Sequence, residues 1–422
     1  MTAPVLAIDF GTSNSAAAVL DGGAVRRLEI EPGAGTLPTA VFFLARGGAM
    51  RIGTAAADAL VAGEEGRYMR ALKSVLGTAL LHEPRLIAGR RRTLAQVVTA
   101  FLAEVKARAE AAAGQRFDRV LSGRPVHFHT NAPDRDAQAE ADLRACYLAA
   151  GFTDVAFRAE PEAAALACRA MGLAGEAGLI VDIGGGTSDF SVFRSGVGGV
   201  EILASHGIRL GGTDFDHAVS MAHAMPLLGL GGALRRTFGD GLLPVPRGVY
   251  VDLSTWAMIP FLYTPETARL VADMQRHAVD QGPMQRLARV IADQSGHDLA
   301  FAVERGKIAA NGGAPGAAIA MGMAEPGLTA AITPASLNAA LLGYRDALRS
   351  AMLETLFRAG VAPGAVGSVV LVGGSSLMAL VAAESRAVCR AARIERSEVF
   401  TAVVDGLALA TARGAGQAGT MG

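Results

Sequence analysis

The sequence feature that most constrains the fold is a pair of matching hairpin patterns that lie far apart in the chain. Residues 179–193 predict an apolar strand that ends in Asp182, a turn of three glycines and a second strand. Residues 7–20 repeat the order of apolar strand, Asp, Gly, a Thr-Ser pair and a further strand. A unit repeated at long separation predicts two related lobes, each of which offers one hairpin to a shared cleft.

The turn of the second hairpin has the chemistry of a phosphate site. Three consecutive glycines allow the backbone to bring its N–H groups close to phosphate oxygens. Asp182, Thr187 and Asp189 stand at the mouth of this turn, and carboxylate and hydroxyl oxygens suit the Mg²⁺ that accompanies a phosphate. Either pattern alone is also what an ordinary hairpin turn requires. The occurrence of both favours the phosphate interpretation.

Length and composition exclude several classes of protein. A chain of 422 residues predicts two or more domains. Because Lys plus Arg and Asp plus Glu are equal at 39 each, no overall field attracts nucleic acid or an anionic membrane. Cys146, Cys168 and Cys389 fit neither a disulfide framework nor a CxxC metal site. No secretion signal or membrane span is evident, so we expect a cytoplasmic protein.

The first half of the chain alternates between strand and helix patterns. A helix is predicted from Leu94, with Thr93 as its N-cap and Gly114 at its end. A strand that must break by Pro125 follows, and then a helix over 134–150. This rhythm indicates an α/β fold. His127 and His129 could share a strand face and bind a metal, but the lack of nearby ligands at metal spacing favours a structural role.

Two charged residues and a third glycine turn have open interpretations. From spacing alone, Lys73 is an ordinary solvated surface cation. Glu160 precedes Pro161 at the start of a predicted helix, where it either stabilises the helix dipole or serves as a water-positioning base. The turn at Gly211, Gly212 and Thr213 precedes a helix, a further arrangement that suits phosphate oxygens.

The second half of the chain contains a loop-rich stretch at 226–263 and a helix near 299–311. On that helix, residues 304, 307, 308 and 311 share one face, which is either a solvated edge or a surface for a ribose and base. A buried strand at 369–372 runs into a glycine turn, the usual place for a ligand. A last helix at 399–412 contains Gly406, which predicts a close packing contact, and the tail at 414–422 should be disordered.

Several of these stretches resemble motifs of one known family, the actin-like ATPases. Within it they are most similar to the nucleotide-binding domain of the DnaK-type heat shock protein 70 chaperones. The matching stretches are IDFGTSNS at 8–15, EPEAAA at 160–165, DIGGGTSD at 182–189 and LVGGS at 371–375. They resemble the first phosphate, first connecting, second phosphate and adenosine motifs, and the similarity in order and spacing spans nearly all of residues 3–412.

Three further stretches favour the chaperone branch over actins or sugar kinases. KSVLG at 73–77 resembles the segment of the catalytic lysine, and LGGTDFD at 210–216 resembles the third glycine turn. RPVHF at 124–128 is similar to short, YegD-like members, and Pro125 aligns with a proline proposed as an interlobe switch.

The resemblance implies an actin-like ATPase fold of the ribonuclease H-like class. It implies two lobes with mixed sheets flanked by helices around a central nucleotide cleft. Lobe I would comprise 1–175 completed by 397–422, and lobe II 176–396 with a loop-rich and helical insertion at about 223–311. The implied function is a chaperone that binds ATP, hydrolyses it slowly, and changes its lobe angle for a client or co-chaperone.

The resemblance also assigns roles to individual residues. Asp9 and Asp182 would hold Mg²⁺ through waters. Lys73, Glu160 and Thr187 would orient the attacking water with the help of Asp189. The residues expected to contact ATP or ADP are Gly11, Thr12, Ser13, Asn14, Gly184, Gly185, Gly186, Thr187, Gly211, Gly212, Thr213, Glu304, Lys307, Ile308, Asn311, Gly373, Gly374, Ser375 and Leu377.

The chain departs from the family pattern in two places. Ile308 and Leu377 stand where the chaperones clamp adenine between two arginines, which gives up a cation–π term of roughly 0.5–2 kcal/mol per contact. In addition, we expect a short form that lacks the peptide-binding sandwich and lid of the chaperones. Two alternative functions remain on the same fold: a nucleotide-dependent scaffold or filament, and a small-molecule kinase. The oligomeric state stays open.

Overall fold

The computed structural model describes residues 4–45, 47, 50–62, 64–129, 132–170, 177–196, 199–237, 239–396 and 401–412. The chain divides into two compact units, which we call unit 1 (Met1–Gly211 with Asp346–Gly422) and unit 2 (Gly212–Arg345). The expected lobe boundaries lie at other residues and stay a prediction. The tail expected to be disordered lies outside the described residues.

The first sheet of unit 1 is built around the N-terminal hairpin. Its strands run in the order β11-β10-β1-β2-β3, with β4 beside β2. β1 is antiparallel to β2 and parallel to β10, β2 is antiparallel to β3, and β10 is parallel to β11. The bounds are β1 Val5–Phe10, β2 Asn14–Asp21, β3 Ala24–Leu28, β4 Leu37–Pro38, β10 Arg119–Arg124 and β11 Asp154–Ala159.

The second sheet of unit 1 contains the central hairpin and repeats this arrangement. Its order is β14-β13-β12-β19-β20, in which β12 is antiparallel to β13 and parallel to β19, β13 is antiparallel to β14, and β19 is parallel to β20. The bounds are β12 Ala177–Ile183, β13 Ser188–Gly196, β14 Gly199–Ile208, β19 Val366–Val372 and β20 Arg393–Arg396. The two sheets therefore share one topology, as the repeated sequence pattern predicts.

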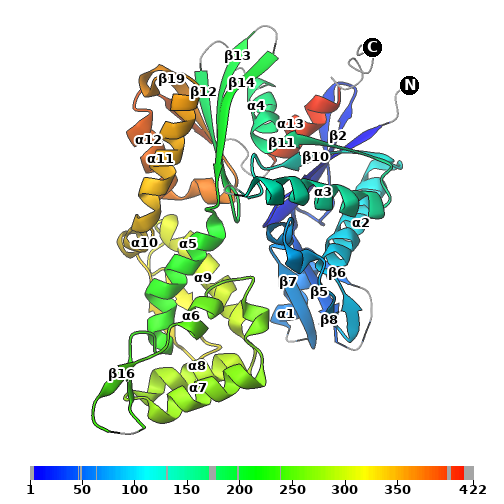
Figure 1. The fold of residues 1–422 in the computed structure, drawn as a ribbon. Coiled ribbons are helices and arrows are strands. Elements are labelled where there is room, and N and C mark those ends of the chain that lie inside the picture. Colours follow the sequence, from blue (N-terminus) through cyan, green and yellow to red (C-terminus); the bar gives the residue numbers. More distant parts are fainter. Residues whose placement is uncertain are drawn as a thin grey trace. The chain divides into compact units, whose positions relative to one another are not determined.

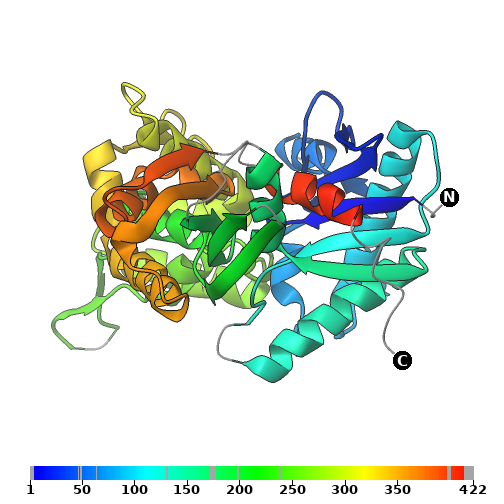
Figure 2. The same ribbon diagram turned by 90° about the horizontal axis from the view of Figure 1, so that it is seen from above.

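Two small-residue helices pack against each other over the first sheet. α4 (Glu160–Ala170) and α13 (Ala402–Thr411) lie side by side, and α13 also contacts β1 (Figures 1 and 2). A Cβ atom on Gly406 would lie 1.7 Å from the carbonyl oxygen of Ala163. Only glycine permits this approach, so the close contact predicted at Gly406 is confirmed.

Two longer helices, α2 (Leu94–Ala113) and α3 (Pro133–Ala149), pack against the other face of the first sheet. As predicted, Thr93 caps α2, accepting a hydrogen bond from the Gln96 backbone in a reciprocal capping box, and Gly114 ends the helix in the left-handed conformation. The strand before α3 ends at Arg124, so the expected break by Pro125 is confirmed.

The remaining elements of unit 1 are short strands and helices. β5, β6 and β7 form one small sheet, and β8 pairs with β9. The bounds are β5 Ala40–Leu44, β6 Arg51–Ile52, β7 Gly66–Arg70, β8 Arg85–Ile87, β9 Arg90–Arg92, α1 Thr54–Val61, α12 Ala379–Val388 and α11 Leu342–Arg358, which begins in unit 2.

Unit 2 is mainly helical. α5 packs against α9, and α7 lies beside α8 (Figure 1). The bounds are α5 Gly212–Val219, α6 Gly248–Leu253, α7 Pro265–His277, α8 Gln281–Ala292, α9 Gly296–Asn311, α10 Pro334–Ala340, β15 Ala233–Arg235, β16 Leu242–Pro244, β17 Ala318–Ala320 and β18 Thr329–Ala331. The stretch expected to be rich in loops thus includes α6 and the β15–β16 hairpin. Within the described part of the chain, no helix is long and apolar enough to cross a membrane.

Candidate functional site

Three glycine turns of unit 1 come together. The turn between β1 and β2 approaches the turn between β12 and β13, because a Cβ atom on Gly185 would lie 2.4 Å from Ser13 Oγ and 3.3 Å from Thr12 Cβ. A Cβ atom on Gly211 would lie 2.6 Å from the backbone of Gly185 and of Gly186. The candidate phosphate residues of these turns are therefore neighbours in space.

Both hairpin turns are closed by local backbone contacts, and the first is tight enough that only glycine fits at position 11. Gly184 donates a backbone hydrogen bond of 3.0 Å to Thr187, and a Cβ atom on Gly11 would lie 2.2 Å from the carbonyl oxygen of Asn14. The Ser13 carbonyl accepts a 2.8 Å hydrogen bond from the Thr39 backbone, which fixes the first turn to its neighbour. Backbone held in this way can direct N–H groups at an anion without further reorganisation.

The strands beside these turns carry three carboxylates. Asp9 lies near the end of β1, and Asp182 on β12 stands opposite Asp189 on β13. Both Asp182 and Asp189 are buried. Two glycines make room for them, since a Cβ atom on Gly207 or on Gly373 would lie 2.7 Å from the Oδ1 atom of Asp189 or of Asp182, respectively.

A buried ion pair stands beside the carboxylates. Lys73 Nζ lies 2.6 Å from Glu160 Oε1, and the side chains are 8% and 12% exposed. Glu160 is the first residue of α4, and Gly123 on β10 leaves space for it. The interpretation of Lys73 as a solvated surface cation is therefore wrong. Its partner lies 87 residues away, so spacing within its own segment carried no signal.

Burial and mutual repulsion raise the pKa values of the carboxyl groups in this cluster. Loss of hydration, followed by the Glu160 charge, raises the pKa of Asp9 to about 7 and that of Asp189 to about 8. The same two causes raise the pKa of Asp182 well above its ordinary value. Burial alone would lower the pKa of Lys73, but Glu160 and Asp9 outweigh it and the pKa is raised. One lysine thus faces four carboxyl groups.

The segment that carries Lys73 is held by residues that the sequence reasoning missed. The Gly77 backbone donates a 2.9 Å hydrogen bond to Asp142 Oδ2, and His129 Nε2 donates a 2.7 Å hydrogen bond to the carbonyl oxygen of Leu76. Asp142 is buried on α3. Its signal is visible in retrospect, since it is a charged residue inside the apolar stripe formed by Ala139, Leu143 and Cys146.

His127 and His129 lie near this segment, beyond the end of β10. The alternative in which His127 and His129 share a strand face is therefore wrong, while the favoured structural role agrees with the hydrogen bond from His129 to Leu76. Among the residues that the structure describes, no group of three His, Cys, Asp or Glu side chains could hold a metal ion directly. A directly coordinated metal site at His127 and His129 is therefore not supported.

The remaining residues expected to contact the nucleotide lie in both units. In unit 1, Gly373 takes a φ of 80° directly after β19 and precedes Gly374, Ser375 and Leu377. In unit 2, Gly212 and Thr213 begin α5, and Glu304, Lys307, Ile308 and Asn311 lie on α9. Their common contact with one nucleotide stays a prediction.

The two α9 residues at the centre of this group point differently. Lys307 is buried and lies 2.7 Å from Asp216 Oδ1 on α5. Ile308 is 60% exposed. Unit 2 therefore anchors the lysine and leaves the isoleucine at its surface.

Two sheets of the same topology meet through their glycine turns, and carboxylates lie at the ends of the strands beside these turns. This arrangement defines the actin-like ATPase fold. Residues 85–225 match the family model of the Hsp70 protein. The chain is also similar to a chaperone protein DnaK of Endomicrobium trichonymphae, with 32% identity over 224 residues, which are 51% of this chain and 34% of that protein. These matches make the chain similar to the Hsp70 family over part of its length, and the second one spans about a third of the length of this relative.

Proposed function

We propose that this chain binds ATP with Mg²⁺ and hydrolyses it slowly, as the nucleotide-binding part of an Hsp70-type chaperone. The observation that carries the proposal is the buried pair of Lys73 and Glu160, set among three carboxylates with raised pKa values and beside apposed glycine turns. The similarity to a chaperone protein DnaK supports the same conclusion.

The residues present fit a hydrated Mg²⁺ ion. Mg²⁺ usually keeps several waters and is held by one or two carboxylates together with substrate phosphates. Asp9 and Asp182 supply two carboxylates, and burial followed by the charge of Glu160 raises the pKa of each. The ion would supply positive charge and neutralise phosphate oxygens.

The remaining residues divide the work of phosphoryl transfer, in which a protein mainly positions groups and offsets charge. Backbone N–H groups of the turns at 11–14 and 184–186 would bind phosphate oxygens. Lys73, Glu160 and Thr187 would orient the attacking water. Asp189, which accepts a 3.1 Å hydrogen bond from the Val126 backbone, would assist by taking up the proton of that water.

We further propose that the nucleotide state alters the angle between lobes, which a client or co-chaperone in the cytoplasm detects. A ligand can shift such an equilibrium only by binding one arrangement more tightly than the other. Residues expected to contact the base occur in both units, which supports this form of coupling.

The decisive experiment measures phosphate release from Mg-ATP. Lys73→Ala and Glu160→Ala should each lower kcat by at least about tenfold, because each removes a group that positions the water. Lys106→Ala is the matched control, since Lys106 forms a comparable 2.7 Å ion pair with Glu110 on α2. Calorimetry with ATP on the same proteins separates binding from hydrolysis. Wild-type kcat in both site variants would contradict the proposal.

A further inference from the structure

The stretch between β10 and α3 touches both parts of the candidate hydrolytic site. We call residues 125–129 the linking segment. The Val126 backbone donates to Asp189 Oδ1 at 3.1 Å, and His129 Nε2 donates to the carbonyl oxygen of Leu76, three residues beyond Lys73. The segment belongs to neither a helix nor a strand. Its conformation must therefore be set by side-chain contacts rather than by a regular hydrogen-bond ladder.

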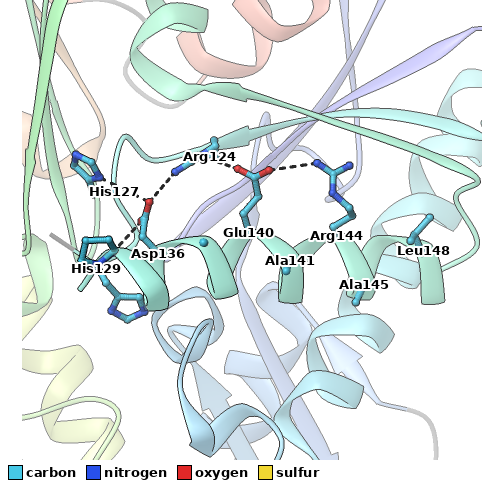
Figure 3. A pocket seen from close by; sticks show the side chains of 11 residues that line it. Arg124, His127, His129, Asp136, Glu140, Ala141, Arg144, Ala145 and Leu148 are labelled. Atoms are coloured by element: carbon cyan, nitrogen blue, oxygen red, sulfur yellow. Dashed lines mark hydrogen bonds and ion pairs between the residues drawn. The ribbon is translucent and has the colours of Figure 1, made fainter. Parts of the chain in front are cut away.

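Arg124 donates to the carbonyl oxygens of Pro125 and Val126 at 3.1 and 3.2 Å, and one carboxylate binds the rest of the segment. Asp136 Oδ1 accepts hydrogen bonds from the Phe128 backbone at 2.5 Å and from the His129 backbone at 3.3 Å. Asp136 Oδ2 accepts one from Arg124 Nη2 at 3.2 Å and lies 3.8 Å from His127 Nδ1 (Figure 3). Asp136 thus contacts residues 127–129 of the linking segment and also Arg124, the last residue of β10. Hydrogen bonds to an ionised acceptor are stronger than neutral ones.

A neighbouring carboxylate shows what is particular to Asp136. Glu140 lies one turn further along α3 and lines the same groove (Figure 3). It accepts hydrogen bonds from Arg124 at 2.6 Å and from Arg144 at 3.3 Å. These contacts are between side chains only. Glu140 therefore reaches the linking segment only through Arg124, whereas Asp136 also accepts hydrogen bonds from its backbone N–H groups.

We propose that Asp136 is a positioning residue for ATP hydrolysis, acting through the linking segment on Asp189 and on the Lys73 segment. The inference rests on the proposed function. When Asp136 holds the Phe128 and His129 backbone, Val126 on one side and the His129 ring on the other are kept where they bind the two parts of the site. Asp136 itself touches neither candidate catalytic group in any contact described above.

The first test compares Asp136→Ala with Glu140→Ala. Asp136→Ala should lower kcat for ATP by about tenfold or more and change the ATP dissociation constant by less than about threefold, because it disturbs positioning and not binding. Glu140→Ala should stay within about twofold of wild type in both quantities. If Asp136 only stabilised α3, both variants would unfold more easily while kcat stayed at the wild-type value, and that result would overturn the inference.

The second test asks whether the effect passes through Asp189. In a double-mutant cycle, Asp136→Ala should lower kcat much less in an Asp189→Asn background than in wild type, because the group that it positions is already removed. Full additivity of the two losses would contradict action through Asp189.

A third measurement distinguishes failure of this inference from failure of the proposed function. Amide hydrogen exchange on the full chain without nucleotide should be about tenfold faster or more at Val126 and Phe128 in Asp136→Ala, and unchanged in Glu140→Ala. A wild-type protein that does not hydrolyse ATP would refute the proposed function, while the exchange data would still decide the positioning. Unchanged exchange at Val126 would refute the inference even if hydrolysis occurs.

Discussion

At the scale of single residues, the molecule keeps carboxyl groups where water cannot hydrate them. Asp189 is 2% exposed, and Lys73 is the cation that opposes its raised pKa most. Burying carboxyl groups lowers the stability of a folded protein, and such groups are typical of sites where a cationic ligand supplies the opposing charge. The arrangement is therefore better suited to binding than to stability of the empty protein.

The raised pKa values predict how the empty protein responds to pH. In the unfolded chain an Asp loses its proton near pH 4. In the folded protein the pKa is about 7 for Asp9 and about 8 for Asp189. Between these values the folded state binds more protons, so its stability should fall as pH rises from about 4 to about 8. Urea denaturation without nucleotide or Mg²⁺ measures this dependence.

Asp189→Asn provides the control for the pH experiment. The amide does not titrate, so the fall in unfolding free energy between pH 6 and pH 9 should be reduced in this variant. Equal stability of the wild-type protein across the whole range would show that the carboxyl groups titrate normally.

At the scale of elements, the contact between α4 and α13 makes a sharp prediction. Gly406→Ala should lower the unfolding free energy by about 3 kcal/mol or more, because the new methyl group would overlap the Ala163 carbonyl. Chemical denaturation of the variant gives this value directly.

Gly343→Ala is the matched control, since a Cβ atom there meets nothing within 4 Å and the residue lies on α11. Alanine favours a helix over glycine by roughly 0.5–1 kcal/mol, so this variant should be unchanged or slightly more stable. Equal losses in the two variants would mean that the close approach at Gly406 is absent in solution.

Local elements could be predicted from the sequence because their signals are local. Each of these signals depends on residues within one turn or strand. Examples are the hairpins that turn at Gly11 and Gly184, the capped helix after Thr93 and the strand break at Pro125. The burial of Lys73 could not be predicted from its own segment, because its environment is built by residues distant in sequence. Only the resemblance to a known family brought Lys73 and Glu160 into one site.

The candidate site was predicted less completely than the fold. The glycine turns and the strand-end carboxylates were named, but Asp136 and Asp142 were not. Both lie on a helix whose sequence indicates an ordinary surface helix, and both act on backbone groups of other segments. The place of Asp142 within an apolar stripe indicates its burial but not its partner, and Asp136 has no such signal.

At the scale of the whole molecule, the proposed nucleotide is expected to contact residues of both units, which can be tested through its base. Ile308→Arg should tighten ATP binding by roughly 2- to 30-fold, because a guanidinium adds a cation–π term to the stacking contact. Ile308 is 60% exposed, so the change should not disturb the core of unit 2. Calorimetry with Mg-ATP measures the effect.

Two controls make this experiment specific. Tripolyphosphate has no base, so its affinity should not change beyond the general effect of one added positive charge. Leu353→Arg adds the same charge at an exposed leucine on α11 and accounts for that general effect. If Ile308→Arg improves ATP and tripolyphosphate binding equally, Ile308 does not face the base.

The place of α13 in the first sheet has a consequence for biosynthesis. Val404 and Leu407 of this helix belong to the same buried cluster as Ala7 of the first strand. A nascent chain therefore cannot complete that cluster until residues 402–411 have left the ribosome. During translation, the apolar surface of β1 therefore stays exposed until α13 has been synthesised. The first sheet can complete its packing only after the intervening polypeptide has been made.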